Sequence, residues 1–192
     1  MSCLSSVITS AAPIVVGVSL VIYGYYVKVI KARNFLNEAL SGIDVQLERR
    51  YEVLPNILTI AQKFMDHERG MITEITELRT KAMNAVSGSA EKFKTEGELS
   101  SKLSSLMVAV ENYPQLKSNE VMVEAMKTYQ DIEENIAAAR RFYNTALRKL
   151  HDAVMIFPGS LFASFAGDYK NFAYFETEES HKKSIRATDY LK

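Results

Sequence analysis

The sequence predicts an all-α membrane protein, with an N-terminal transmembrane helix followed by an antiparallel bundle of four long helices. Three observations support this fold class. The first 27 residues carry no charge, apolar residues then recur every three or four positions, and proline (four) and glycine (eight) are scarce. A spacing of three and four marks one face of a helix, and so few chain breakers favour long helices over many-stranded sheets.

Composition excludes several classes of protein. The 192 residues suit one domain of ordinary size with accessory segments. Lys+Arg and Asp+Glu number 23 each, and this balance argues against nucleic-acid binding, which needs an excess of cations to neutralise phosphates. Cys3 is the only cysteine, so neither an intramolecular disulfide nor a thiolate-rich metal site is expected.

Residues 1–27 are interpreted as a short outside tail and a transmembrane anchor. Residues 7–27 would reach roughly 30 Å as a helix, which matches the hydrocarbon core of a bilayer. A cleaved signal peptide needs basic residues ahead of its apolar stretch, and residues 1–6 have none, so an uncleaved anchor is favoured. The lipid bilayer is therefore the first expected partner.

The charges that follow the anchor predict its orientation. Lys28, Lys31 and Arg33 all precede the first acidic residue, Glu38. Because cytoplasmic flanks of membrane helices carry an excess of Lys and Arg, we expect the N-terminus outside and the rest of the chain in the cytoplasm.

Residues 28–156 are predicted to form the cytoplasmic helical bundle. The apolar stripe predicts four helices, at residues 28–54, 57–86, 98–112 and 118–156, with a polar loop at 84–97. Leu40, Leu47, Leu54 and Ala61 recur at sevens, as in a coiled-coil-like seam. Pro55 either kinks one long helix or marks a turn between two. The unbroken register favours a kink, the segment lengths favour a turn, and both stay open.

Polar residues within these apolar stripes are the first candidate site. Arg50 occupies a heptad position between Ile43 and Ile57, where an unpaired charge would be costly. On the fourth helix Glu133, Arg140 and Tyr143 share one face, at spacings of seven and three. Asp44 and Glu133 are the expected carboxylate partners of Arg50 and Arg140. The group is either a structural ion-pair network that sets helix register or a polar groove that receives a partner.

A set of short motifs is spread along the chain: Arg33-Asn34, Ile43-Asp44-Val45-Gln46-Leu47, Arg49-Arg50, Leu54-Pro55-Asn56, His67-Glu68, Tyr113-Pro114, Ala139-Arg140, Tyr143-Asn144, Phe157-Pro158 and Tyr174-Phe175-Glu176. Over roughly residues 26–176 these motifs resemble the LemA family of bacterial membrane-anchored proteins. The resemblance implies a short outside tail, one membrane helix and a cytoplasmic helical bundle at the inner membrane. One branch of the family is tied to membrane organisation, and members often lie beside a membrane metalloprotease gene.

The second candidate site is an aromatic-rich segment, residues 157–175, which is expected to pack on the bundle. It includes Phe157, Tyr169 and Phe172. The segment either caps the bundle or forms a surface that contacts the membrane or a partner, since aromatic residues with polar tips suit both. Residues 176–192 are expected to form a polar, mobile tail.

Catalytic motifs are sparse, so we expect no enzyme, no metal and no cofactor. His67-Glu68 has no second histidine four residues on, and Glu178-x-x-His181 occurs once, whereas a di-iron bundle needs two such motifs. The sequence shows neither a glycine-flanked serine elbow nor a glycine-rich phosphate loop.

Two functions fit these features. The first is a membrane-anchored scaffold that forms a homo-oligomer and organises or shapes the inner membrane. The surplus of apolar and small residues on the fourth helix, together with Gly17 and Gly24 in the anchor, favours it. The second is an adaptor or regulator that binds another membrane protein, such as a membrane metalloprotease in envelope quality control.

Overall fold

The structure is a computed structural model that describes the backbone of residues 2–175 and the side chains of residues 13–175. The described residues are helical and contain no strand, so the predicted all-α class is confirmed. In chain order the elements are α1 (Ser2–Phe64), η1 (Asp66–Glu68), α2 (Arg69–Asn84), α3 (Ala90–Val110), α4 (Pro114–Lys117), α5 (Glu120–Met155), η2 (Gly159–Ala166) and η3 (Tyr169–Asn171).

Helix α1 runs without a break from the predicted anchor into the helical domain, for 63 residues. Pro55 lies inside it, and the turn into α2 comes only at residues 65–68. The expected boundary between helices at 28–54 and 57–86 is therefore wrong, and the alternative of one long helix through Pro55 is correct. The helix continues past Pro55. Proline has no N–H to donate to the Tyr51 carbonyl, and this carbonyl instead accepts a hydrogen bond from Arg79 Nε of α2 at 3.0 Å.

Helix α3 begins at Ala90, eight residues before the predicted start at residue 98. Residues 90–97 are therefore helical and do not form the expected loop. Ser89 is its N-cap and accepts a hydrogen bond from the Lys92 N–H at 3.1 Å. The first turns of α3 bury polar side chains along with Phe93, and this explains why a search for apolar residues missed them. These buried polar residues are Lys92, Thr95 and Glu96.

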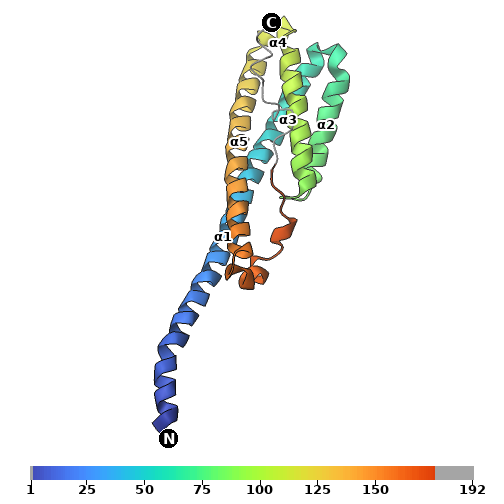
Figure 1. The fold of residues 1–192 in the computed structure, drawn as a ribbon. Coiled ribbons are helices and arrows are strands. Elements are labelled where there is room, and N and C mark those ends of the chain that lie inside the picture. The colour runs from blue at the N-terminus through green and yellow to red at the C-terminus, as the bar shows by residue number, and fades with distance from the viewer. Residues whose placement is uncertain (1, 176–192) are drawn as a thin grey trace, which may run out of the picture.

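The core lies where the helices pack along the part of α1 that follows the anchor (Figure 1). The most extensive contact joins α1 to α5, and α2 pairs with α3. The apolar stripe predicted this core well: its buried residues include Leu36, Ile43, Leu47, Leu54, Ile57 and Ala61 on α1, and Met122, Tyr129, Ile136, Tyr143 and Leu150 on α5.

The N-terminal part of α1 extends beyond the other helices. It is long and apolar enough to cross a membrane, with a mean hydropathy of 1.8 over its most apolar window. Its large apolar side chains, from Ile14 to Tyr23, are about half to two-thirds exposed. Elements η2 and the C-terminal end of α5 lie beside this part of α1. The predicted tail at 176–192, with Glu178 and His181, lies outside the described residues.

Candidate functional site

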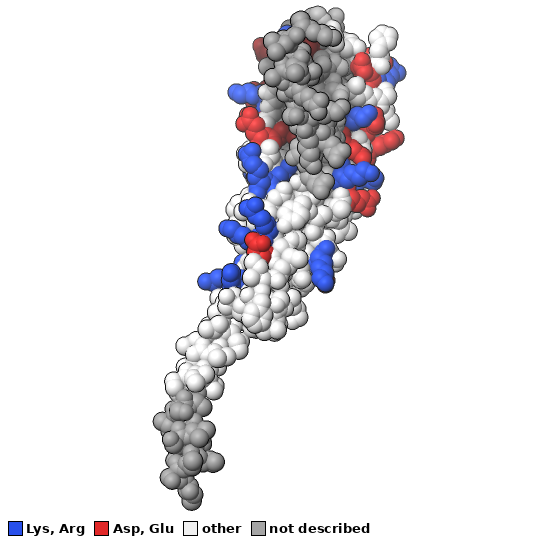
Figure 2. Space-filling model, viewed as in Figure 1, with Lys and Arg blue, Asp and Glu red and all other residues white. Residues whose placement is uncertain are grey.

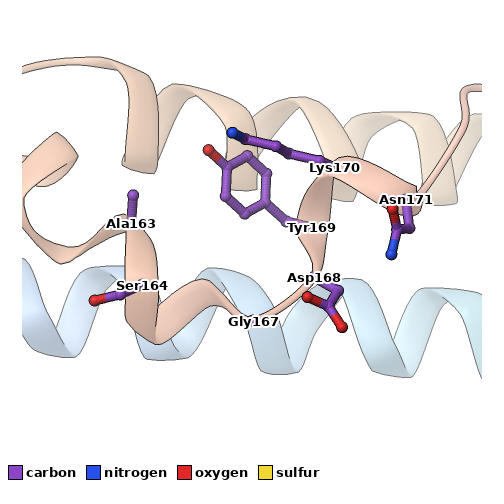
Figure 3. Close-up of a pocket in the computed structure, with 7 residues that line it drawn as sticks. All are labelled: Ala163, Ser164, Gly167, Asp168, Tyr169, Lys170 and Asn171. Carbon is purple, nitrogen blue, oxygen red and sulfur yellow. The ribbon is translucent and has the colours of Figure 1, made fainter.

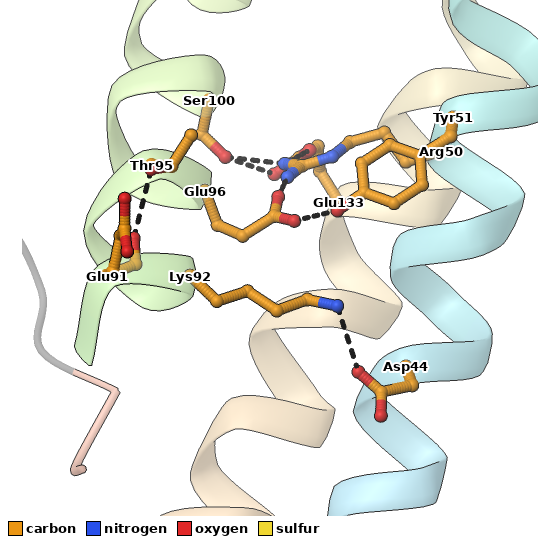
Figure 4. Close-up of polar contacts among 9 residues, drawn as sticks. All are labelled: Asp44, Arg50, Tyr51, Glu91, Lys92, Thr95, Glu96, Ser100 and Glu133. Atoms are coloured by element: carbon orange, nitrogen blue, oxygen red, sulfur yellow. Dashed lines mark hydrogen bonds and ion pairs between the residues drawn. The ribbon is translucent and has the colours of Figure 1, made fainter. Parts of the chain in front are cut away.

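The most enclosed polar group of the molecule is built around Arg50, whose side chain is fully buried (Figure 4). Its Nη1 donates to Ser100 Oγ and to Glu133 Oε1, both at 2.7 Å, and its Nη2 donates to Glu96 Oε2. Tyr51 donates its hydroxyl to the other Glu96 oxygen. We call Arg50, Tyr51, Glu96, Ser100 and Glu133 the Arg50 cluster.

Three helices contribute to the Arg50 cluster, which therefore joins α1, α3 and α5. Arg50 and Tyr51 come from α1, and Glu133 comes from α5. Glu96 and Ser100 lie four residues apart on α3, which places them on one helix face. A guanidinium suits this place because its planar fork reaches several acceptors at once. The group thus joins three helices through one buried side chain.

Burial shifts the proton equilibria around the cluster. Desolvation raises the pKa of the Tyr51 hydroxyl to about 12, while the charge of Arg50 works in the opposite direction. The pKa of Tyr129 is also raised, first by burial and then by the neighbouring Glu133 carboxylate. Both phenols therefore stay protonated to a higher pH than an ordinary tyrosine.

Arg140 lies near this cluster but is not paired within it. Its Nε and Nη2 are buried and have no hydrogen-bond partner within residues 13–175, and its guanidinium lies 4.0 Å from the centre of the Phe175 ring. Burial lowers the pKa of Arg140 to about 10, and the positive charge of Arg50 adds to this effect while Glu133 opposes it. Arg140 is held by stacking on an aromatic ring rather than by a carboxylate.

The predicted pairing is thus correct for Arg50 with Glu133 and wrong for Asp44. The Asp44 carboxylate instead contacts Lys92 Nζ at 3.5 Å and accepts a hydrogen bond from Ser87 Oγ (Figure 4). A separation of six residues turns Asp44 about 240° around α1 from Arg50, so the two side chains face different neighbours. Sequence reasoning missed Glu96, Ser100 and Tyr51. The available signal was the helical spacing of Phe93, Glu96, Leu99 and Leu103, which places Glu96 on the apolar face of the helix.

The last described residues, 172–175, run as an extended strap across α5 and the loop before α3; we call them the C-terminal strap. Tyr143 donates its hydroxyl to the Ala173 carbonyl at 2.9 Å. The Asn144 amide pairs with both backbone groups of Phe175, each at 2.9 Å, as a neighbouring strand would. Burial, followed by Tyr174, raises the pKa of Tyr143. The Tyr143-Asn144 motif therefore binds the strap.

The strap also depends on Gly88, which lies in the loop between α2 and α3. Ala173 N–H donates to the Gly88 carbonyl at 3.2 Å. Gly88 has a φ of +75°, and a Cβ there would lie 2.7 Å from Phe172 Cδ1. Only glycine combines this backbone conformation with such a close approach of an aromatic ring.

The other aromatic candidates are more open. Phe157 is 76% exposed at the junction of α5 and η2. The Tyr169 ring lies 5.9 Å from His151, which also contacts the Tyr174 hydroxyl at 3.2 Å. The turn between η2 and η3 encloses a cavity of about 370 Å³, in which Tyr169 and Lys170 extend in the same direction and Asp168 points away (Figure 3).

No group of three or more His, Cys, Asp or Glu side chains within residues 13–175 is placed to hold a metal ion. The cavity at Tyr169 is not lined by any member of the Arg50 cluster.

Comparison with known proteins agrees with the motifs. None of the curated proteins compared with this chain matches it. The model of the LemA family matches residues 39–188, which is most of the chain and includes the Arg50 cluster and the C-terminal strap. The chain belongs to the LemA family.

Proposed function

We propose that this protein is a non-enzymatic, membrane-anchored scaffold that self-associates to organise or shape the bacterial inner membrane. The observation that carries this proposal is the continuity of α1, which runs from an exposed apolar segment into the packed domain without a linker. A helix of this kind transmits the position of the domain directly to the bilayer. The Arg50 cluster adds to this by joining α1 to α3 and α5.

The proposed orientation puts the N-terminus outside and the domain in the cytoplasm, with α1, α2, α3 and α5 as an antiparallel four-helix bundle. Lys28, Lys31 and Arg33 support this orientation because they follow the apolar segment directly. The helix pairs α1–α5 and α2–α3 support the bundle.

Self-association is proposed to use the anchor. Gly17 and Gly24 lie seven residues apart, and a Cβ added at either would meet no atom within 4 Å. Residues seven apart lie on one face of a helix, and small residues on such a face allow membrane helices to approach closely. An adaptor that binds another membrane protein is the second candidate, and the exposed Val108, Val121 and Val123 on α3 and α5 favour it.

The decisive experiment is the mass of the full-length protein, purified gently and measured in nanodiscs. We expect a homo-oligomer in the parent and a lower order in the double variant Gly17→Val/Gly24→Val. The control Val16→Leu changes a neighbouring exposed position without removing a small residue. A monomeric parent would refute the scaffold and leave the adaptor as the better proposal.

A further inference from the structure

The longest uncharged stretch after the anchor lies where α5 ends. Between Asp152 and Asp168 the chain carries no charged side chain for 15 residues, 153–167. This uncharged segment contains the last residues of α5 and all of η2. Its large apolar side chains point outward: Met155 is 73% exposed, Ile156 63% and Leu161 68%. Soluble proteins rarely leave so many large apolar side chains exposed side by side.

The uncharged segment lies against the membrane anchor. The two elements form an apolar groove of about 540 Å³, and Tyr26 packs edge-on against Phe165 at 5.2 Å. The segment is therefore at the depth of the anchor's own apolar residues, not above them. The groove is lined by Ile14, Gly17, Val18, Val21 and Ile22 of α1 and by Phe157, Pro158, Leu161 and Phe162.

The depth can be estimated from helix geometry. Gly17 lies ten residues before Val27, the last residue of the predicted span, which corresponds to roughly 15 Å along the helix. This is about half of the 30 Å hydrocarbon core. If α1 spans the bilayer, the uncharged segment reaches the middle of it and occupies a single leaflet.

The backbone of the segment suits an apolar medium. Most of its residues belong to the 3₁₀ helix η2, whose hydrogen bonds are internal, and the Leu161 N–H donates to the Pro158 carbonyl at 3.1 Å. Pro158 has no N–H that would need a partner. Gly159 allows the tight turn after α5, since a Cβ there would lie 1.9 Å from the Ala153 carbonyl oxygen. These features reduce the number of backbone groups that would need a partner in the apolar layer.

Cationic side chains border this apolar region. Asp152 and Asp168 flank the segment directly. Beyond these two acids, Lys28, Lys31 and Arg33 lie on α1, Arg148 and Lys149 precede Asp152, and Lys170 follows Asp168. In Figure 2 the lowest described part of the molecule is uncharged, and mostly blue side chains lie above it. Such a border suits the phosphate groups of lipids.

We infer that residues 153–167 insert into the bilayer leaflet on the side of the helical domain, next to the anchor, and that lipid acyl chains cover their exposed face. The inference rests on the part of the proposed function in which α1 spans the membrane, and it does not require self-association. A wedge that occupies one leaflet displaces lipid there and not in the other leaflet. It would therefore give a scaffold of this kind a direct means of bending the membrane.

The test uses single-cysteine forms of the full chain in a Cys3→Ser background, in vesicles rich in phosphatidylethanolamine with some phosphatidylglycerol. A small environment-sensitive fluorophore is attached at Leu161→Cys, at Val108→Cys or at Val18→Cys. Leu161 and Val108 are matched, because each is 68% exposed, but Val108 lies on α3 away from the anchor. The quenchers are nitroxide groups on lipid acyl chains and aqueous iodide.

We expect the label at Leu161 to be quenched by nitroxide lipids about as strongly as the label at Val18, and several-fold more strongly than the label at Val108. Iodide should show the opposite order. If Leu161 is open to iodide like Val108 while Val18 is quenched by lipid, the inference is overturned and the anchor stands. If Leu161 is shielded from both quenchers, protein covers it, and the inference is again wrong. If Val18 escapes lipid quenching, the membrane span itself fails, and with it both proposals.

Discussion

Arg79 provides the hydrogen bond that Pro55 withholds from Tyr51. The Tyr51 carbonyl lies one helical turn before Pro55 and would normally accept from the backbone N–H of residue 55. Proline has no such N–H, and Arg79 Nε of α2 lies 3.0 Å from the carbonyl oxygen instead. The second helix therefore completes the backbone pairing of the first.

This relationship predicts a coupling between residues 55 and 79. Arg79→Ala should lower the free energy of unfolding by about 1–3 kcal/mol, because it leaves a buried carbonyl without a partner. In a Pro55→Ala background the loss should be smaller, since an alanine at this position supplies its own backbone N–H. Urea unfolding of the parent, both single variants and the double variant measures the coupling. Equal losses in the two backgrounds would show that the Arg79 bond does not compensate for Pro55.

A second prediction concerns Arg50. Arg50→Ala should cost about 3–5 kcal/mol, because it removes the counter-ion of the fully enclosed Glu96 and leaves that side chain with the Tyr51 hydroxyl. Arg50→Leu alone should be nearly as costly for the same reason. The triple variant Arg50→Leu/Glu96→Leu/Tyr51→Phe removes the whole buried set and should recover most of the stability.

The control for this series is Lys81→Ala. Lys81 Nζ lies 3.9 Å from Glu91 with both side chains largely exposed, and such pairs contribute about 0–1 kcal/mol. Thermal or urea unfolding followed by circular dichroism gives the comparison. If Arg50→Leu alone matched the parent, Glu96 would have to reach water in the folded state.

A third prediction concerns alkaline pH. The Tyr51 pKa is about 12 in the folded chain and 10.0 for an ordinary tyrosine, so between these values the folded state binds more protons. The contribution of the protonated Tyr51 hydroxyl to the free energy of unfolding is complete below pH 10 and is lost as the pH rises toward 12. Arg140 acts in the opposite sense, because its folded pKa of about 10 lies below the ordinary 12.5.

Stability measured by urea unfolding above pH 10 should therefore fall less steeply in Tyr51→Phe than in the parent. It should fall more steeply in Arg140→Gln, which removes the opposing group. The comparison uses the slope of the free energy of unfolding against pH rather than its absolute value, since each variant also loses contacts. Identical slopes in all three proteins would mean that neither group titrates as its burial requires.

A fourth prediction concerns the C-terminal strap. Gly88→Ala should destabilise the protein by about 1–2 kcal/mol for the left-handed backbone alone, with an added cost from the contact with Phe172. Adding Phe172→Leu to Gly88→Ala should remove the cost of the contact with the ring but not the cost of the left-handed backbone. Hydrogen exchange at the Ala173 N–H, which bonds to Gly88, reports on the strap directly. Unchanged exchange in Gly88→Ala would show that the strap does not need this loop.

The fifth prediction concerns topology. A membrane-impermeant thiol reagent should label Cys3 in intact spheroplasts. In a Cys3→Ser background, Val86→Cys should stay unlabelled until lysis; Val86 is 76% exposed in the loop before α3, so its access depends only on the membrane. The reverse pattern would overturn the orientation proposed from Lys28, Lys31 and Arg33.

The apolar part of the fold was predictable because its signal is local. Positions such as Leu47, Leu54 and Tyr143 repeat at helical spacing, and each is fully buried. The start of α3 was not predictable in this way. Its first turns bury Lys92 and Glu96, and charged residues in a sequence normally indicate a solvent-exposed segment. Burial of a charge depends on a partner elsewhere in the chain, and spacing along one helix does not reveal that partner.

The same reason explains the candidate site. Arg50 in an apolar stripe signals that a carboxylate must lie nearby, and Glu133 was found by its place on a facing stripe. Asp44 was misassigned because it is close to Arg50 in sequence, although it turns toward α3 and Lys92. The stacking of Arg140 on Phe175 depends on how the strap folds back over α5, which no local pattern encodes.

Because α1 is unbroken, a small tilt of its predicted membrane span moves the far end of the helix by a large distance. From Val27 to Phe64 the helix extends roughly 55 Å beyond the predicted span, at 1.5 Å per residue. Membrane helices tilt to match the thickness of the surrounding bilayer. A tilt of about 10° would swing the far end of α1 sideways by roughly 10 Å, because no flexible joint absorbs the angle. In the proposed assembly, bilayer thickness would thus set the distance between neighbouring domains.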